Sequence, residues 1–185
     1  MKKLLATRYS LHSERGYSLI ELMVAIGVFG VVVTIMSGTF MISLRGQGKS
    51  ATMQNIADNA RYAMEVMAKE MRMGMIKASE GYVLNASSDI QFRSNMPNRN
   101  GAIVRFYLDV PTGQIMFDDD ISDALTPEPI TAANIAVSAL TFDVSGASSL
   151  SQPRITIAMQ AASAGTAADV ATRMDLQTTI SPRSL

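Results

Sequence analysis

The sequence predicts an α+β fold in which one long amino-terminal helix packs on an antiparallel β-sheet. An uninterrupted apolar run occupies residues 22–44, and helical periodicity continues from there to about residue 78. After Gly81 the pattern alternates with a period of two and turn residues multiply. One helix followed by strands is typical of an α+β domain, whose sheet needs the helix to complete its core. We therefore divide the chain into four parts: a basic leader (1–16), an apolar helix (17–45), an amphipathic stem helix (46–78) and a β-rich head (79–185).

Composition argues against several classes of protein. The chain has no cysteine, so it can form neither a disulfide framework nor a thiolate metal site. Its formal net charge is zero and it shows no basic stripe with interleaved aromatic residues, so we expect no nucleic-acid partner. The only histidine is His12, which leaves a catalytic triad or a histidine metal site without support. We expect that the protein is not an enzyme.

Residues 1–16 form a short basic leader. They carry four basic side chains and one acidic side chain, whereas the rest of the chain carries 12 basic and 15 acidic ones. A basic segment directly before an apolar span orients the span so that the basic segment stays in the cytoplasm. The residues after Arg45 should then lie on the extracytoplasmic side.

The apolar run from Leu22 to Leu44 has 23 uncharged residues, which as a helix would measure about 35 Å. That length crosses a hydrocarbon layer of about 30 Å with some tilt, so the segment predicts a single-pass membrane helix. A secretory signal has its cleavage site after the apolar core, but here the glycine suited to processing, Gly16, precedes it. The apolar helix would therefore survive cleavage.

Glu21 places one carboxylate at the edge of this apolar run. Inserting such a charge costs a few kcal/mol, which implies a partner or a later change of environment. The alternative is that Glu21 extends to the interface of an inert anchor. Within the run, Gly30, Thr34 and Gly38 recur every four residues and predict a smooth face for helix packing. The alternative for that face is the general abundance of small residues in membrane helices.

Beyond Lys49 the pattern predicts an amphipathic stem. Asp58, Arg61, Glu65 and Lys69 lie on the polar side, where Arg61–Glu65 and Glu65–Lys69 have the i,i+4 spacing of ion pairs. A methionine-rich stripe at helical spacing could be a soft-metal face, but a plain core face is favoured. The stripe consists of Met53, Ile56, Ala60, Met64, Met67, Met71 and Met75.

The remaining residues predict strands separated by loops rich in small and turn-forming residues. The segments 140–144 and 154–159 alternate most clearly, which points Thr141, Asp143 and Arg154 away from the core. The predicted strands are 82–84, 90–93, 103–109, 114–117, 136–144, 154–160 and 173–180.

The junction between the basic leader and the apolar run resembles a known signature. The stretch RGYSLIELMVAIGVFGVVV is similar to the prepilin leader of type IV pilins and type II secretion pseudopilins. The resemblance implies that an inner-membrane prepilin peptidase cuts after Gly16 and methylates the new amino terminus at Tyr17, where phenylalanine is the commonest residue. It also implies that Glu21 is the acidic residue needed for assembly. The protein would reside in the inner membrane and then join a pilus or pseudopilus filament.

The rest of the chain narrows this resemblance. The stem DNARYAMEVMAKEMRMG, the strands ALTFDV and PRITIAMQ and the ending TTISPRSL are similar to the large minor subunits, the J-type minor pseudopilins and W-type minor pilins. This implies a subunit at the filament tip that takes part in initiating or capping assembly. Its partners would be other minor and major pilins or pseudopilins and the inner-membrane assembly platform. A second hypothesis is a membrane-tethered ligand-binding protein that does not polymerise, for which Glu21 would serve no purpose.

One acidic cluster offers oxygen ligands for calcium. Asp118, Asp119, Asp120 and Asp123 repel one another unless they are neutralised, which gives a calcium site a physical motive. The segment lacks the spacing and the terminal glutamate of an EF-hand, so the favoured interpretation is a solvated acidic loop. We expect no cofactor, with calcium as the alternative.

Overall fold

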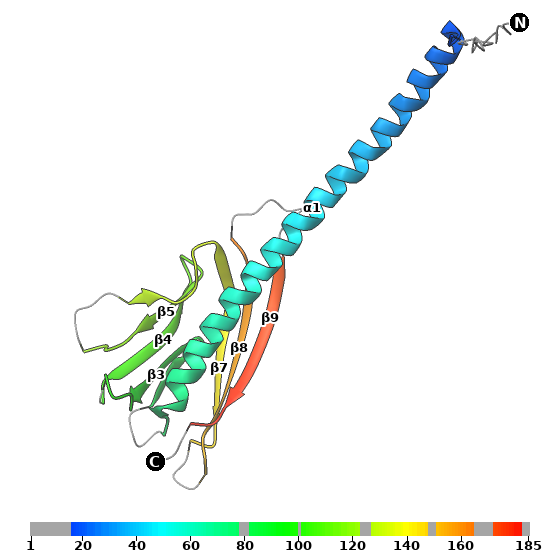
Figure 1. Ribbon diagram of the computed structural model, residues 1–185. Coiled ribbons are helices and arrows are strands. Elements are labelled where there is room, and N and C mark those ends of the chain that lie inside the picture. Colours follow the sequence, from blue (N-terminus) through cyan, green and yellow to red (C-terminus); the bar gives the residue numbers. More distant parts are fainter. Residues whose placement is uncertain are drawn as a thin grey trace, which may run out of the picture. The chain divides into compact units, whose positions relative to one another are not determined.

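The chain divides into two compact units, residues 1–44 and Arg45–Leu185. The computed structural model describes residues 16–77, 82–99, 101–122, 127–147, 151–164 and 172–182. Helix α1 (Leu19–Arg72) contributes to both units, and the described strands all follow it in the second unit (Figure 1). The strands are β1 (Gly74–Met75), β2 (Val83–Ala86), β3 (Asp89–Ser94), β4 (Ile103–Asp109), β5 (Gln114–Asp118), β6 (Glu128–Pro129), β7 (Ile135–Ser145), β8 (Arg154–Ser163) and β9 (Arg173–Ile180).

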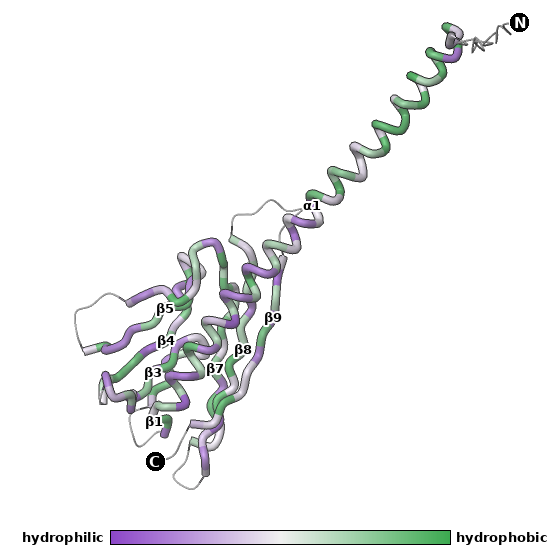
Figure 2. Tube along the Cα trace, in the orientation of Figure 1, coloured by the Kyte–Doolittle hydropathy of each residue, from purple (hydrophilic) through white to green (hydrophobic). Residues whose placement is uncertain are grey.

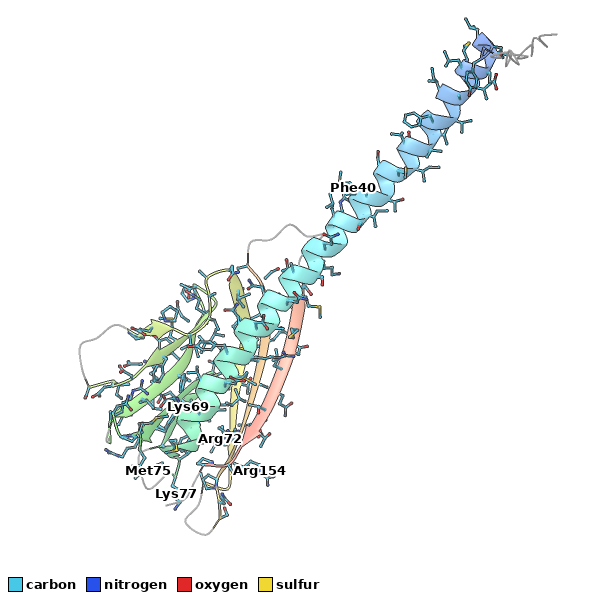
Figure 3. All side chains as sticks on the ribbon, viewed as in Figure 1. Phe40, Lys69, Arg72, Met75, Lys77 and Arg154 are labelled. Atoms are coloured by element: carbon cyan, nitrogen blue, oxygen red, sulfur yellow. The ribbon has the colours of Figure 1, made fainter. Side chains whose placement is uncertain are left out.

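The first unit buries none of its apolar surface within the chain. Every described residue of this unit, from Gly16 to Leu44, is exposed, including large side chains such as Phe29 and Phe40. Figure 2 shows this part of α1 as hydrophobic almost all round, and Figure 3 shows Phe40 projecting from it. By length and composition the helix can cross a membrane. Its exposed apolar surface requires lipid or other helices as a neighbour.

Three hydroxyl groups of the apolar segment are satisfied inside the helix. Thr34, Ser37 and Thr39 each donate a hydrogen bond to the carbonyl oxygen four residues earlier, at 2.9, 2.8 and 3.0 Å. A hydroxyl bonded in this way presents no unpaired donor to a hydrocarbon layer. These three residues are therefore compatible with a membrane location.

The second unit consists of two antiparallel sheets with the stem of α1, residues 45–72, packed against them. One sheet has the strand order β1-β3-β4-β5-β6, with β2 also paired to β3, and the other has the order β7-β8-β9. The stem contributes buried residues such as Ile56, Met64, Met67 and Met71 to the core. The prediction of a pilin-like α+β fold, with a long helix on antiparallel strands, is confirmed.

The two sheets share one hydrophobic core beneath the stem. Phe92 and Phe106 come from the first sheet, and Phe142, Ile155 and Ile157 come from the second. These five side chains are at most 2% exposed. The core of the second unit is therefore continuous across both sheets.

The methionine-rich stripe of the stem is a core face from Ile56 to Met71, as the sequence favours. Met53, the first residue of the predicted stripe, is instead exposed. On the strands, Thr141, Asp143 and Arg154 are exposed as their alternation predicts.

The β-rich head, residues 79–185, forms two sheets in its described part, whereas the sequence pattern predicted one. The backbone amide of Val137 donates to the carbonyl oxygen of Gly113, and that of Phe142 donates to Ser87, both at 2.7 Å. These isolated bonds join β7 to two turns of the first sheet without continuing its ladder. The sheets therefore meet at a seam, which strand periodicity alone cannot reveal.

Strand bounds agree with the predicted ranges to within a few residues. The ranges of β4 and β9 are as predicted, and β8 is longer, because it continues to Ser163 in a segment predicted to begin a loop. The two-residue strands β1 and β6 were not predicted. The second, Glu128–Pro129, lies in a segment assigned to a loop, and pairs with Met116 and Phe117 of β5.

The stem helix ends at Arg72, not at residue 78 as the periodicity predicts. Gly74 instead begins β1 and pairs with Ser94 of β3. A Cβ atom on Gly74 would overlap the ring of Phe92, which is fully buried. The chain must therefore pass close to this ring, and Met75, the last residue of the predicted stripe, belongs to a strand.

We expect Gly74→Ala to destabilise the second unit by about 1–3 kcal/mol, because the added methyl group forces the Phe92 ring out of its packed position. Urea unfolding of the detergent-solubilised chain, followed by circular dichroism, measures the change. Gly46→Ala is the matched control: nothing lies within 4 Å of its Cβ position, and this helical residue should gain up to about 1 kcal/mol. Equal stability of the Gly74→Ala variant and the native chain would contradict the close approach.

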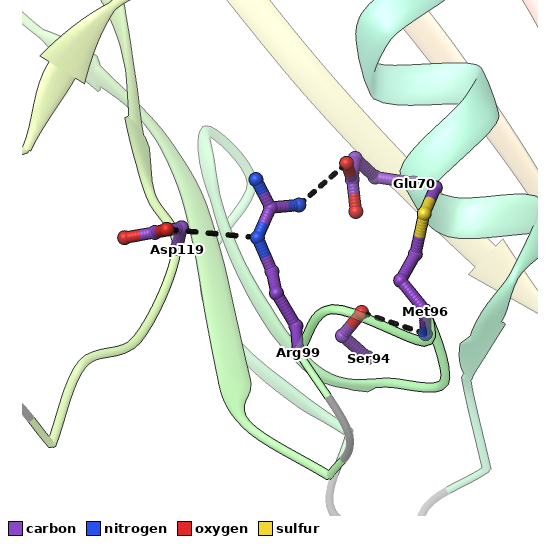
Figure 4. A network of polar contacts seen from close by, with 5 residues as sticks. All are labelled: Glu70, Ser94, Met96, Arg99 and Asp119. Atoms are coloured by element: carbon purple, nitrogen blue, oxygen red, sulfur yellow. Dashed lines mark hydrogen bonds and ion pairs between the residues drawn. The ribbon is translucent and has the colours of Figure 1, made fainter.

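One buried ion pair ties the end of the stem to the first sheet. Arg99 Nη1 donates to Glu70 Oε1 at 2.6 Å, and Arg99 Nε lies 3.6 Å from Asp119 Oδ2 (Figure 4). The guanidinium also lies 4.9 Å from the centre of the Phe117 ring. The pair thus fixes the loop between β3 and β4 against the last turn of α1.

Candidate assembly site at the start of the helix

The predicted processing site lies directly before the first turn of α1. Gly16, Tyr17 and Ser18 are not helical, and α1 begins at Leu19. Nothing lies within 4 Å of the Gly16 Cβ position, and the Tyr17 side chain is 84% exposed. An exposed segment outside regular secondary structure is accessible to a peptidase.

Ser18 caps the helix, a role that the sequence analysis missed. Its Oγ accepts a hydrogen bond from the Glu21 backbone amide at 3.2 Å, and its carbonyl oxygen accepts one from Leu22 at 3.1 Å. This leaves Ser18 at the N-cap position and Glu21 at the third helical position. The sequence does contain the signal, because a serine followed three residues later by a glutamate is the pattern of a capping box.

The Glu21 carboxylate is exposed, and no described residue forms a hydrogen bond or ion pair with it. Among the described residues, the carboxylate is near only the positive end of the helix dipole, an interaction worth typically about 0.3–1 kcal/mol on an exposed surface. This gain is smaller than the cost of a few kcal/mol for a charge in an apolar layer. The carboxylate is therefore available for a stronger cationic partner from another molecule.

The small-residue face contacts nothing else in the described chain. The Cβ positions of Gly30 and Gly38 are open, and Thr34 turns its hydroxyl group back to the Gly30 carbonyl oxygen. This hydrogen bond keeps Thr34 from presenting a free donor on that face. Packing of Gly30, Thr34 and Gly38 against another helix stays a prediction.

The acidic cluster is not assembled into a metal site by the described residues. Asp119 pairs with Arg99, while Asp120 accepts hydrogen bonds from the Ser122 amide and hydroxyl at 3.0 and 2.5 Å. These bonds hold the pKa of Asp120 below its ordinary value. Asp118 belongs to β5, and Asp123 lies outside the described residues. No group of three potential ligands occurs among the described residues. The expectation of no cofactor, with calcium as the alternative, stays a prediction.

Comparison with known proteins identifies the same junction. Residues 11–37 match the family model described as the prokaryotic N-terminal methylation motif. No curated protein and no solved structure matches the chain. The matched residues include Gly16, Tyr17 and Glu21 and extend into the apolar segment. The motif implies processing by a prepilin peptidase and assembly with other pilins.

Together the motif and the apolar helix indicate the inner membrane, followed by a filament. Proteins with this leader are structural subunits, so the chain is not an enzyme. The methylation motif, in a chain whose long amino-terminal helix packs on antiparallel sheets, places this protein in the type IV pilin and pseudopilin superfamily.

Proposed function

We propose that the protein is a minor pilin or pseudopilin subunit that helps to initiate or cap assembly of a type IV pilus or a type II secretion pseudopilus. The observation that carries the proposal is the methylation motif, which contains an exposed Glu21 carboxylate without a partner in the described chain. Cleavage falls after Gly16, and Tyr17 becomes the methylated amino terminus. The basic leader stays in the cytoplasm, and the head lies on the other side of the membrane.

Cleavage creates the charge that Glu21 lacks. The new amine at Tyr17 is a cation at the same end of the apolar helix as the carboxylate. Pairing two opposite charges offsets most of the cost of holding either alone in an apolar layer. Glu21 of an incoming subunit binds the Tyr17 amine of its neighbour, which favours the transfer of the helix from lipid into a filament and sets the axial offset.

The minor role rests on the layout of the stem and head. The stem stretch DNARYAMEVMAKEMRMG and the strand pair β7 and β8 carry the similarity to the large minor subunits. As such a subunit, the protein joins other minor subunits at the tip and meets major subunits and the assembly platform below. These contacts prime the filament rather than form its bulk.

Mass spectrometry of the protein extracted from membranes tests the processing step. We expect a species that lacks residues 1–16 and carries one extra methyl group on Tyr17. Deleting the prepilin peptidase should leave the full chain of 185 residues in the same membranes. A Gly16→Leu variant is the matched control in cells that retain the peptidase, because the bulkier residue obstructs the cut without changing the apolar helix.

An intact leader in cells with active peptidase would contradict the proposal and favour the membrane-tethered ligand-binding protein. Co-purification from membranes tests the minor role. Enrichment of other small pilin-like subunits at near-equal amounts supports a tip complex, whereas a large excess of this chain in sheared filaments would contradict a minor role.

A further inference from the structure

The exposed face of the stem carries an ordered series of charges. Asp58, Arg61, Glu65 and Lys69 are all exposed, on the side opposite the buried residues of the same helix. From Asp58 to Lys69 their signs alternate at spacings of three or four residues, and the exposed Arg72 then follows Lys69 with the same sign. Tyr62, which is 58% exposed, adds a large aromatic surface to the same face. We call Asp58, Arg61, Tyr62, Glu65 and Lys69 the stem stripe.

The charges of the stem stripe do not pair with one another. Arg61–Glu65 and Glu65–Lys69 have the spacing of helical ion pairs, yet neither closes to ion-pair distance in the described chain. The ion pairs of the described residues involve other side chains, as in Arg105–Asp89 at 2.9 Å and Arg99–Glu70 at 2.6 Å. Figure 3 shows Lys69 near the carboxyl end of α1. The stripe is therefore free to meet charges from another molecule.

The charge order is complementary to itself when two stems lie parallel with an offset. Copies anchored in one membrane by the same end must run parallel, so equal residues face each other when there is no offset. Glu65 then opposes Glu65 and Lys69 opposes Lys69, which is repulsive. An offset of four residues, about 6 Å along the helix, brings Arg61 level with Glu65 of the second copy. It also brings Glu65 level with Lys69 of the second copy.

These pairs determine register more than affinity. Exposed ion pairs contribute about 0.2–1 kcal/mol each, so alone they would not hold two proteins together. Anchoring in one membrane supplies a high effective concentration, and Tyr62 supplies apolar contact. Under these conditions the attraction of opposite charges at one offset and the repulsion of like charges at another are enough to select the first. Charges beside the apolar seam of a coiled coil set its register in the same way.

We propose that the stem stripe binds the stem of a second copy of this chain in a parallel arrangement offset by four residues. The proposal rests on the proposed function only in that the copies share one membrane or filament. The same separation of four residues lies between Tyr17 and Glu21. An offset pair joined by Tyr17 and Glu21 therefore also matches the charges of its stems. Such a pair is the smallest unit from which a helical filament can start.

Disulfide formation in membranes tests the offset, because the native chain has no cysteine. Two tagged full-length copies are co-expressed, one with Gln54→Cys and the other with Asp58→Cys, and then oxidised. Both positions are exposed on the stripe side, and an offset of four residues brings them level. We expect this mixed dimer to exceed the Gln54→Cys homodimer roughly tenfold, because disulfide geometry needs Cβ atoms about 3.5–4.5 Å apart. Equal or preferred formation of the homodimer would overturn the offset.

Charge reversal tests the cause of the register. Glu65→Lys, added to both copies, places three basic residues in sequence and should lower the mixed dimer roughly tenfold. The triple variant Arg61→Glu, Glu65→Arg and Lys69→Glu inverts the three signs that form the two proposed pairs and should restore the mixed dimer. Indifference of the dimer to Glu65→Lys, or failure of the triple variant to restore it, would overturn the proposal. Crosslinking to a different protein instead of a second copy would also overturn it.

The experiment is performed in cells without the assembly platform, so no filament is needed. A mixed dimer that depends on Glu65 but comes from a chain with an intact leader would support the stem pairing while contradicting the proposed function. Absence of the mixed dimer in these cells would refute only the pairing if leader removal is normal there and if assembly depends on Glu21 in cells that retain the platform.

Discussion

A Glu21→Gln variant should enter the membrane and lose its leader normally but fail to join filaments. The substitution removes one charge from the first turn of α1 and leaves the Tyr17 amine of the neighbour without a partner. A cation left unpaired in an apolar layer costs about 3 kcal/mol or more, which corresponds to roughly a hundredfold loss of incorporation or greater. The amount of this subunit in sheared filaments, relative to its amount in membranes, measures the effect.

The Glu21→Gln substitution separates the assembly role from helix capping. Glutamine is accepted at the third position of a capping box as glutamate is, so the helix start is preserved while the charge is lost. Ser18→Ala is the opposite control, because it removes the capping Oγ at a cost of about 1 kcal/mol and retains the carboxylate. We expect Ser18→Ala to be incorporated. Normal incorporation of Glu21→Gln, or equal defects of the two variants, would show that the carboxylate has no pairing role.

The candidate membrane segment and the methylation motif could be predicted because their signals are local. The apolar run, the basic leader and the separation of Gly16 from Glu21 are properties of consecutive residues and need no tertiary structure. The structure adds Ser18 as the cap, which the same local pattern encodes. What the sequence could not provide is the availability of the Glu21 carboxylate, because that depends on which side chains lie nearby.

The ends and pairing of elements in the head were harder to predict because they depend on distant residues. Met75 continues the helical spacing of the stem, but α1 ends at Arg72 because Gly74 must pass beside the ring of Phe92. Likewise, the alternation of β7 predicts a strand but not the sheet to which it belongs. Bonds from Val137 and Phe142 to turns of the other sheet fix that arrangement. Contacts between residues that are far apart in sequence leave no periodic pattern in the sequence itself.

The burial of Glu70 is another feature that the sequence alone could not predict. In the sequence it is one of several charges in the stem, yet the residue is only 7% exposed. It also lies in the last turn of α1, where a carboxylate meets the negative end of the helix dipole. Its burial depends on Arg99, which is 29 residues away in sequence and lies in a loop. Helical periodicity therefore cannot identify it as a buried residue.

Arg99→Ala should destabilise the head more than Glu70→Ala does. Without Arg99, the Glu70 carboxylate remains buried at an unfavourable helix end, and the cost should approach about 3 kcal/mol or more. Without Glu70, Arg99 keeps its contact with Asp119 and the Phe117 ring, and its side chain is 20% exposed, so the loss should be about 2 kcal/mol. Urea unfolding of the detergent-solubilised chain compares the two.

The double variant Glu70→Met and Arg99→Met separates two quantities: the net contribution of the ion pair to stability, and the cost of removing only one of its partners. Two apolar side chains of similar length remove both charges, so neither is left buried alone, and stability should return to within about 1 kcal/mol of the native chain. Glu65→Ala is the surface control on the same helix and should change stability by less than about 0.5 kcal/mol. If the losses of the two alanine variants were instead reproduced additively in the double variant, the pair would not act as a unit. The fixed position of the β3–β4 loop would then need the Arg99–Asp119 contact as its cause.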